Sequence, residues 1–461
     1  MRTGRGAEEL RRRMGTVVLM EVATGDIKAI SNLEKSDNGT YIESMNHAVL
    51  GFEPGSVMKT ISMVIALEDG FTRDPETEYY NIPGGGYRFG GGSPIRDTHS
   101  PPSLPVSRFL EYSSNIGMTM LVAPHYKDNP NGFRERIAQM GLLDKLGTGI
   151  AEETPPYFPK LDIRSGGLTS LGRQTYGYAS RISPLYVCAF YNAIANNGDF
   201  VRPRLVSKLQ KNGVDSVIPV TYVRRNICSH RHAAQVREML HKVIYGQGGT
   251  AKALKDPVID IAGKTGTSKI ARELSQEDLE KYKKNPKDPT IKHVKGYEDG
   301  AYRYSFCGFF PYAEPKYTCM VMVSRPGNHV VRNAGVISGG ILLNIARRMH
   351  SRGMLGDTPD YHTGEPTTSP VLYATTDATR DGDLKAMLGS SHTHRLSTPR
   401  RTHENTIPDV SGLGLREAIV VIEKAGYNID FKGDGTVIAQ TPPAGTPAKP
   451  GTKVSLTMQK R

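Results

Sequence analysis

One short segment of the chain places a serine three residues before a lysine, as Ser56-Val57-Met58-Lys59. The apolar run that follows predicts a mostly buried helix, and residues three apart on a helix face the same way. The lysine amine can therefore take the serine proton, which a hydroxyl must lose to act as a nucleophile. Free backbone N–H groups at the start of the helix can stabilise an oxyanion, so the pair predicts acyl transfer. If this segment is considered alone, the simpler interpretation is an N-cap serine near an exposed lysine.

Two further segments offer groups for the same chemistry. Ser113-Ser114-Asn115 supplies a hydroxyl and an amide at a loop or helix end, although a capping or turn element is the ordinary interpretation. Lys264-Thr265-Gly266-Thr267 lies on a predicted strand, where Gly allows a ligand to approach the backbone and Lys and Thr can bind a carboxylate. A glycine bulge would explain that segment alone. Together, in this order and about 55 and 150 residues apart, the three segments rarely coincide by chance.

The segments around these motifs predict a domain of mixed α and β structure. Residues 14–32 contain two β-rich runs that form a hairpin with its turn at Gly25. Residues 269–300 are dense in Lys, Glu and Asp with several Pro, and they predict a solvated insertion between two strands. Helices are expected over residues 57–67, 106–120, 184–196 and 341–352, and strands over 259–268, 302–310 and 317–324.

The chain of 461 residues is too long for one ordinary domain. Residues 355–406 are rich in Thr, Ser, Asp, His and Pro, and they predict a mobile polar linker. The pattern turns globular again after it, with an amphipathic helix at 414–425 and strands at 427–431, 436–440 and 453–458. The sequence therefore predicts a domain over 1–354, a linker over 355–406 and a small αβββ module over 407–461.

The net charge of +13 favours an anionic partner. Residues 355–406 carry a net −2 and residues 407–461 a net +2, so the excess belongs to residues 1–354. There is no basic stripe interleaved with aromatic residues and no nucleic-acid motif. We therefore expect a diffuse surface charge and no nucleic-acid partner.

Cysteine spacing and hydropathy limit the remaining classes. Cys188, Cys228, Cys307 and Cys319 are irregularly spaced, which excludes a zinc site and a disulfide scaffold and predicts buried thiols, with one Cys307–Cys319 disulfide left open. No window approaches 18 consecutive apolar residues, and the N-terminus lacks the apolar core of a signal peptide. The chain is thus either cytoplasmic or given without an anchoring segment.

The three motifs together resemble those of the penicillin-binding proteins, which are serine acyltransferases. The likeness covers about residues 14 to 350, and residues 407–461 resemble a single PASTA domain. It implies the α/β (α+β) fold shared by penicillin-binding transpeptidases and serine β-lactamases. The flanking segments that look like a class B transpeptidase are Asn46-His-Ala-Val, Phe52-Glu-Pro-Gly-Ser56, Ile95-Arg-Asp97, Gly177-Tyr-Ala-Ser-Arg-Ile-Ser-Pro184, Asn196-Asn197-Gly198 and Gly246-Gln-Gly-Gly-Thr250-Ala.

The resemblance implies a catalytic role for five residues. Ser56 would attack the carbonyl of the penultimate D-Ala in a D-Ala-D-Ala stem peptide and hold the acyl-enzyme. Lys59 would take the Ser56 proton, and the positive charge of Lys264 would favour its neutral form. Ser113 would relay that proton to the leaving amine. Asn115 would bind the amide of the acyl chain and hold Lys59.

The resemblance also implies how the substrate is held. Thr265, Gly266 and Thr267 would bind the donor, with Lys264 and the two threonines on its terminal carboxylate. The backbone N–H groups of Ser56 and Thr267 would form the oxyanion hole. No metal or nucleotide cofactor is called for.

The function that follows is peptidoglycan D,D-transpeptidation in septal or elongation wall synthesis. Stem peptides and β-lactam antibiotics would be its partners, with cell-division or elongation membrane proteins as further ones. Nothing before Ser56 could house a glycosyltransferase, and the membrane helix and pedestal domain of the family are absent from the chain. The resemblance thus implies a truncated protein from the periplasmic face of the inner membrane, anchored by an N-terminal helix that the chain lacks.

Three other functions use related chemistry. A β-lactamase needs a base poised on a water, but Glu152 and Glu153 stand beside Thr154-Pro-Pro-Tyr-Phe-Pro, which does not resemble an omega loop. A D,D-carboxypeptidase and a β-lactam or muropeptide sensor stay as alternatives, although the PASTA-like module and the class B flanks favour transpeptidation. The insertion 269–300 is either a wall of the cleft or a surface loop.

Overall fold

A computed structural model describes residues 14–356 and 406–459, apart from residues 37, 44, 212–213, 272–279, 282–284, 286–296, 326–332, 414–417, 420, 423–424, 434–435 and 450. The chain divides into two compact units, one within residues 1–385 and the other within residues 386–461. Among the helices of the described ranges, none combines the length and the apolar character needed to cross a bilayer.

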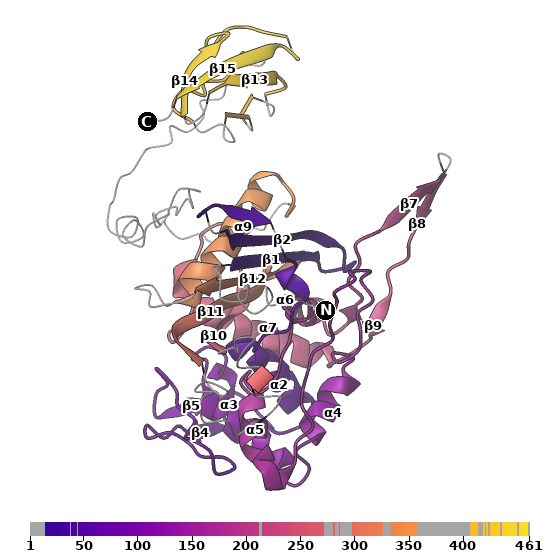
Figure 1. Ribbon diagram of the computed structural model, residues 1–461, viewed down its shortest axis with the longest axis vertical. Coiled ribbons are helices and arrows are strands. Elements are labelled where there is room, and N and C mark those ends of the chain that lie inside the picture. The colour runs from indigo at the N-terminus through magenta and orange to yellow at the C-terminus, as the bar shows by residue number, and fades with distance from the viewer. Residues whose placement is uncertain are drawn as a thin grey trace. The chain divides into compact units, whose positions relative to one another are not determined.

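A six-stranded antiparallel sheet organises the larger unit, in the order β10-β11-β12-β1-β2-β3 (Figure 1). The predicted N-terminal hairpin is confirmed, because β1 pairs with β2 around a turn that includes Gly25. β1 also pairs with β12, so strands from the two ends of this unit meet in the middle of the sheet. The strands are β1 (Met14–Glu21), β2 (Ile27–Lys35), β3 (Tyr41–Glu43), β10 (Ala262–Ala271), β11 (Tyr297–Phe310) and β12 (Tyr317–Arg325).

The helix α6 (Pro184–Ala195) forms the centre of the core. All twelve of its residues are buried, and it packs against β1, β11 and β12. Its start is fixed locally, because the Ser183 side chain accepts from Tyr186 N and a proline occupies the first turn. An apolar helix of this kind is stable only when its whole circumference is covered.

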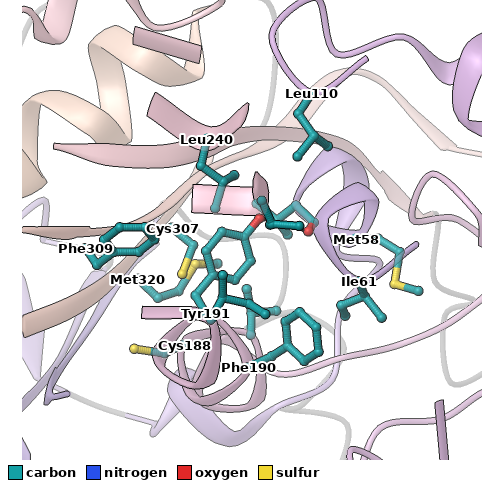
Figure 2. Close-up of a cluster of buried hydrophobic side chains, with 14 of the residues drawn as sticks. Met58, Ile61, Leu110, Cys188, Phe190, Tyr191, Leu240, Cys307, Phe309 and Met320 are labelled. Carbon is teal, nitrogen blue, oxygen red and sulfur yellow. Dashed lines mark hydrogen bonds between the residues drawn. The ribbon is translucent and has the colours of Figure 1, made fainter. Parts of the chain in front are cut away.

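Two helices connect this core to the start of the first motif. Ten of the eleven residues of α2 (Met58–Glu68) are buried, and α7 (His230–Tyr245) packs against both α2 and β10. Figure 2 shows the shared cluster, in which Phe190 and Tyr191 of α6 meet residues of α2, α7 and the sheet. The sheet and the first motif are therefore joined through one continuous apolar core.

The remaining elements of the larger unit are shorter or lie nearer its edges. The hairpin of β7 and β8 projects away from the sheet (Figure 1). The other elements are β4 (Tyr79–Asn81), β5 (Ser103–Pro105), α4 (Gly132–Gln139), α5 (Gly167–Gln174), β6 (Phe200–Val201), β7 (Lys208–Lys211), β8 (Val214–Val217), β9 (Tyr222–Arg224), the π-helical turn η7 (Gly335–Gly339), α9 (Gly340–Ser351) and the short 3-10 turns η1 (His47–Val49), η4 (Ala123–Tyr126), η5 (Ile163–Ser165) and η6 (Lys252–Leu254).

The expected single helix over 106–120 is wrong. The chain forms a 3-10 turn, η3 (Val106–Arg108), and then a separate helix, α3 (Asn115–Val122). Ser113 lies between them with φ +54°, a left-handed conformation that cannot continue a right-handed helix. Asp97, distant in sequence, accepts from the first N–H groups of α3 and so fixes where that helix begins.

The other predicted elements of the larger unit agree with the structure to within a few residues. The helices expected at 57–67, 184–196 and 341–352 correspond to α2, α6 and α9, and the three later strands to β10, β11 and β12. All four cysteines are buried and free, as expected, and the open Cys307–Cys319 disulfide does not form. Most of the insertion 269–300 and nearly all of the linker 355–406 lie outside the described residues.

The smaller unit is a three-stranded sheet with its own apolar core. β13 (Asn428–Lys432) runs parallel to β15 (Lys453–Gln459), which pairs antiparallel with β14 (Thr436–Thr441). Alternate residues of β15 are buried, including Val454 and Leu456. The three predicted strands are confirmed, while much of the helix predicted at 414–425 lies outside the described residues.

Candidate active site

Ser56 lies in a 3-10 turn, η2 (Gly55–Val57), that leads directly into α2. The preceding Gly55 has φ +61°, and its N–H donates to Gly177 O at 3.0 Å. A side chain at Gly55 would lie 2.8 Å from Thr267 O, and one at Gly177 would overlap the Gly55 carbonyl. Glycine is therefore required at both positions, where three backbone segments meet around the serine.

Lys59 connects the first two motifs. Its Nζ donates to Ser56 Oγ at 2.8 Å, to Ser113 Oγ at 3.0 Å and to Ser113 O at 2.6 Å. The side chain is fully buried. The helical spacing thus brings the lysine to the serine as predicted, and the helix break at Ser113 turns both oxygens of that residue toward the lysine.

Lys264 completes the cluster from the third motif. It is also fully buried, and its Nζ donates to Ser113 Oγ at 2.9 Å and to Thr265 O at 3.0 Å. The Ser113 hydroxyl oxygen therefore lies within hydrogen-bond distance of both lysine amines. Residues 151 positions apart meet here, and β10, at the edge of the sheet, also lies beside η2, which carries Ser56.

Burial dominates the ionisation of both lysines. It lowers the pKa of Lys59 to about 7, although the negative charge of Asp97 opposes this shift. Burial also lowers the pKa of Lys264 well below its ordinary value, and the neighbouring Lys59 charge adds to the effect. The positive charge of Lys264 was expected to favour the neutral form of Lys59, and burial is the cause that lowers the pKa of Lys59. Near neutral pH, protonation of both amines at the same time is costly, because two buried positive charges would then lie close together.

The side chain of Asn115 does not hold Lys59 in the described structure. Its Nδ2 donates to Arg96 O at 2.9 Å, and the three donors of the Lys59 ammonium are used by Ser56 and Ser113. Asp97 instead organises this region, since it accepts from Asn115 N, Ile116 N and the Ser114 hydroxyl. The sequence marked Asp97 only as part of a flanking resemblance.

The third motif lies along β10 with its residues facing different ways. Thr265 is nearly buried, and its hydroxyl pairs with that of Thr250 at 2.8 Å. A side chain at Gly266 would collide with Ser305 Oγ and would lie 3.2 Å from Pro54 O. Thr267 is exposed. The backbone of this strand at Gly266 and Thr267 thus lies against the turn that carries Ser56.

Two further residues support the site, and neither was found from the sequence. The buried hydroxyl of Tyr191 donates to Val57 O at 3.0 Å and lies 2.6 Å from Thr60 Oγ1, which fixes the first turn of α2 (Figure 2). The carboxylate of Glu111, paired with Arg108, accepts from Gly248 N and anchors the loop that carries Thr250. A tyrosine within an apolar helix carries no sequence signal for such a role.

The two glutamates considered for a β-lactamase differ in their surroundings. Glu152 is exposed. Glu153 is buried, and its carboxylate accepts from Leu146 N at 2.6 Å and Thr148 Oγ1 at 2.7 Å, with Tyr186 OH at 2.9 Å. The hydrogen bonds to Thr148 and Tyr186 outweigh burial and hold the pKa of this carboxyl below its ordinary value. Glu153 is therefore occupied in bracing a loop.

Comparison with protein families identifies both units. Residues 15–346 match the penicillin binding protein transpeptidase domain, and residues 405–460 match the PASTA domain. The chain is 26% identical to penicillin-binding protein PbpB of Mycolicibacterium smegmatis over 77% of its length and 52% of that protein. It is also 26% identical to the probable peptidoglycan D,D-transpeptidase FtsI of Caulobacter vibrioides, over 73% of its length and 52% of that protein. The chain spans about half the length of these relatives.

Solved structures match the fold of the larger unit. The transpeptidase domain of penicillin-binding protein 3 from Burkholderia pseudomallei aligns with a TM-score of 0.57 and 22% identity, covering 77% of this chain and 92% of that one. Penicillin-binding protein 3 from Mycobacterium tuberculosis, in complex with aztreonam, aligns with a TM-score of 0.58 and 24% identity, covering 77% and 76%. The predicted fold class is confirmed.

Proposed function

Because the chain belongs to the penicillin-binding protein transpeptidase family and carries a PASTA domain, we propose that it is a peptidoglycan D,D-transpeptidase. The observation that supports this most directly is the Ser56–Lys59–Ser113–Lys264 cluster, in which a serine hydroxyl contacts a buried amine whose pKa is about 7. A base with a pKa near the working pH is the one best suited to proton transfer.

In the proposed acylation, Ser56 attacks the carbonyl carbon of the penultimate D-Ala of a stem peptide. Neutral Lys59 takes the hydroxyl proton as the new C–O bond forms, and the backbone N–H groups of Ser56 and Thr267 stabilise the oxyanion. The proton passes through Ser113 to the leaving nitrogen when the peptide C–N bond breaks. Lys264, Thr265 and Thr267 hold the terminal carboxylate, and Gly266 lets the donor lie against β10.

In the proposed transfer step, an amine of a second stem peptide takes the place of the departed D-Ala. Its nitrogen bonds to the acyl carbon, the Ser56 C–O bond breaks, and the amine proton returns to Ser56 through Ser113 and Lys59. The proposed role of Asn115 is to bind the acyl-chain amide, for which its side chain must leave Arg96 O or use its free amide oxygen. β-Lactams would acylate Ser56 in the same way as the donor.

We propose that the chain has two domains joined by a linker. The proposed transpeptidase domain covers 1–354, with the insertion 269–300, and the proposed PASTA domain covers 407–461, after a linker over 355–406. An extracytoplasmic location at the inner membrane, with cell-division or elongation membrane proteins as partners, fits a wall-building substrate. Water as the acceptor would make the same site a D,D-carboxypeptidase, and no transfer at all would make it a sensor.

Intact-mass spectrometry after incubation with benzylpenicillin tests the proposal. We expect one adduct per chain, slow release, and no adduct on the Ser56→Ala variant. A second assay compares transfer from a D-Ala-D-Ala donor to an added amine with transfer to water. Absence of an adduct on the native chain would refute the whole assignment, and release within seconds would indicate a β-lactamase.

A further inference from the structure

A cavity of about 540 Å³ is lined by the segment that leads to Ser56 and lies outside the three motifs. Its walls come from the segment that leads to Ser56, from residues 157–159 and 179–181, and from the far end of the β10 motif strand. Two isolated bridges hold these walls together, Phe52 with Ile182 and Tyr157 with Arg181. The cavity is therefore built from paired backbone segments and does not depend on loose side chains.

The charges of this cavity are mostly positive. Arg181 and Lys269 are exposed at its mouth, and the buried guanidinium of Arg303 stacks 4.4 Å from the centre of the Phe52 ring. Among the described residues of the lining, the one carboxyl group is that of Glu53, whose Oε1 accepts from Ala179 N at 3.1 Å. Burial raises the pKa of this carboxyl even though Arg303 and Arg181 act against the shift. The two exposed cations, Arg181 and Lys269, favour an anionic ligand.

The direction of β10 relates the cavity to the proposed reaction. Lys264 and Thr265 stand at one end of the motif, and the Gly55–Thr267 contact places Ser56 beside its middle. Lys269 follows Thr267 on the same face, about 7 Å farther along the strand. Glu53 is three residues before Ser56, at most about 11 Å away along the chain. The cavity thus lies beyond Ser56, at the end opposite to Lys264.

A donor peptide lying along β10 would have its two ends at opposite ends of the motif strand. With its terminal carboxylate at Lys264 and Thr265, its scissile carbonyl lies at Ser56, and its remaining acyl chain runs toward Lys269. The departed D-Ala and the incoming amine both use the Lys264 end, since the acceptor enters where the leaving group left. The cavity therefore faces the part of the donor that stays on the enzyme.

We propose that this cavity is a donor subsite that selects stem peptides carrying a carboxylate on the residue before D-Ala-D-Ala, with Arg181 and Lys269 as its specificity-determining cations. The proposal rests on the proposed transpeptidase function and adds a substrate preference to it. Arg181 and Lys269 would donate to the carboxylate, and charge-assisted hydrogen bonds of this kind are stronger than neutral ones. Arg303 would contribute its field from beneath, while its stacking on Phe52 keeps the floor of the cavity in place.

The test compares two donor peptides that differ only in one charge, acetyl-L-Glu-D-Ala-D-Ala and acetyl-L-Gln-D-Ala-D-Ala. We expect the native chain to release D-Ala from the Glu peptide with a kcat/KM about tenfold or more above that for the Gln peptide. The Arg181→Gln/Lys269→Gln double variant should lose this preference. Added salt should also reduce the preference, because both cations are exposed.

The control variant is Lys208→Gln/Lys211→Gln on the exposed hairpin of β7 and β8, which removes the same total charge far from the cavity. It should keep the full preference for the Glu peptide. Benzylpenicillin, whose side chain is uncharged, should acylate Ser56 of all three proteins at rates within about twofold of one another. Acylation by benzylpenicillin also shows whether the double variant is folded. It tests the proposed function independently of the proposed subsite.

Several results would overturn the subsite while leaving the proposed function intact. These are equal use of the two peptides by the native chain, a preference that survives in the double variant, and acylation by penicillin without turnover of either peptide. If penicillin does not acylate the native chain, the proposed function fails first, and the subsite fails with it.

Discussion

The two units of the chain bury different kinds of side chain. The larger unit buries Lys59, Lys264 and Glu111 within hydrogen-bonded clusters, whereas the buried residues described in 406–459 are apolar apart from the hydroxyl of Tyr427. Burying a charged group costs free energy unless its partners compensate, so a sequence retains one only where another requirement holds it. The larger unit thus buries charged groups both at the site and in structural clusters such as that of Glu153, whereas the smaller unit, as far as it is described, is held by an apolar core.

The largest expected effect comes from removing the buried amine of Lys59. Lys59→Met keeps the volume of the side chain but leaves Ser56 without its base, so penicillin acylation should fall by about 10²–10⁴-fold. The matched control in the smaller unit is Lys453→Met, which removes an exposed lysine paired with Asp430. The acylation rates of both variants are measured by quenching their reaction with labelled penicillin at successive times. Equal acylation rates for the Lys59→Met and Lys453→Met variants would show that the buried lysine matters no more for acylation than the exposed one.

The pH dependence of acylation sharpens the same contrast. Lys59 can accept a proton only when neutral, and its pKa is about 7. The acylation rate should therefore fall about tenfold for each pH unit below 7 and level off above it. The measurement is the second-order rate constant of penicillin acylation across this range. A rate that is flat below pH 7 would show that Lys59 is not the titrating base.

The hydroxyl of Tyr191 offers a smaller test of how the core reaches the site. Tyr191→Phe removes the buried hydrogen bonds to Val57 O and Thr60 Oγ1, which should lower the free energy of unfolding by about 1 kcal/mol and slow acylation several-fold. Tyr186→Phe is the matched control, because it also loses buried hydrogen bonds, to Asp144 O and Glu153, but not at α2. Thermal melting and acylation rates compare the two. Similar acylation rates would leave Tyr191 a purely structural residue.

The smallest effect is expected from removing the smaller unit. Each unit has its own apolar core, so deletion of residues 357–461 should leave the penicillin acylation rate within about twofold of the native value. The measurement is again the acylation rate, with circular dichroism to check folding. A loss of acylation in a folded deletion variant would mean that the smaller unit acts on the site.

The part of the site that follows local rules could be predicted from the sequence. Helical spacing alone brings Lys59 to Ser56, and the predicted strand carries Lys264 and Thr265. The contact between Lys264 and Ser113 joins distant segments, so only the resemblance to a family pointed to it. The break at Ser113 was missed because it depends on long-range partners, and no helical propensity reveals it.

Other errors have the same origin. Asn115 was expected on Lys59, but the Lys59 ammonium already has three acceptors, and the Asn115 amide donates to Arg96 O. Tyr191 lies in an apolar run whose letters predict only a buried helix. The position of a buried hydroxyl relative to another helix depends on packing, which a single sequence does not specify.

The contact of Gly55 with Gly177 and β10 limits how the site can change over many generations. Three main-chain segments are in contact there with no side chain between them. No substitution can therefore make the side chains next to Ser56 smaller, and almost any substitution would push the segments apart. Exposed positions such as Arg181 and Lys269 are not restricted in this way, so we expect heritable variation in the proposed donor preference there.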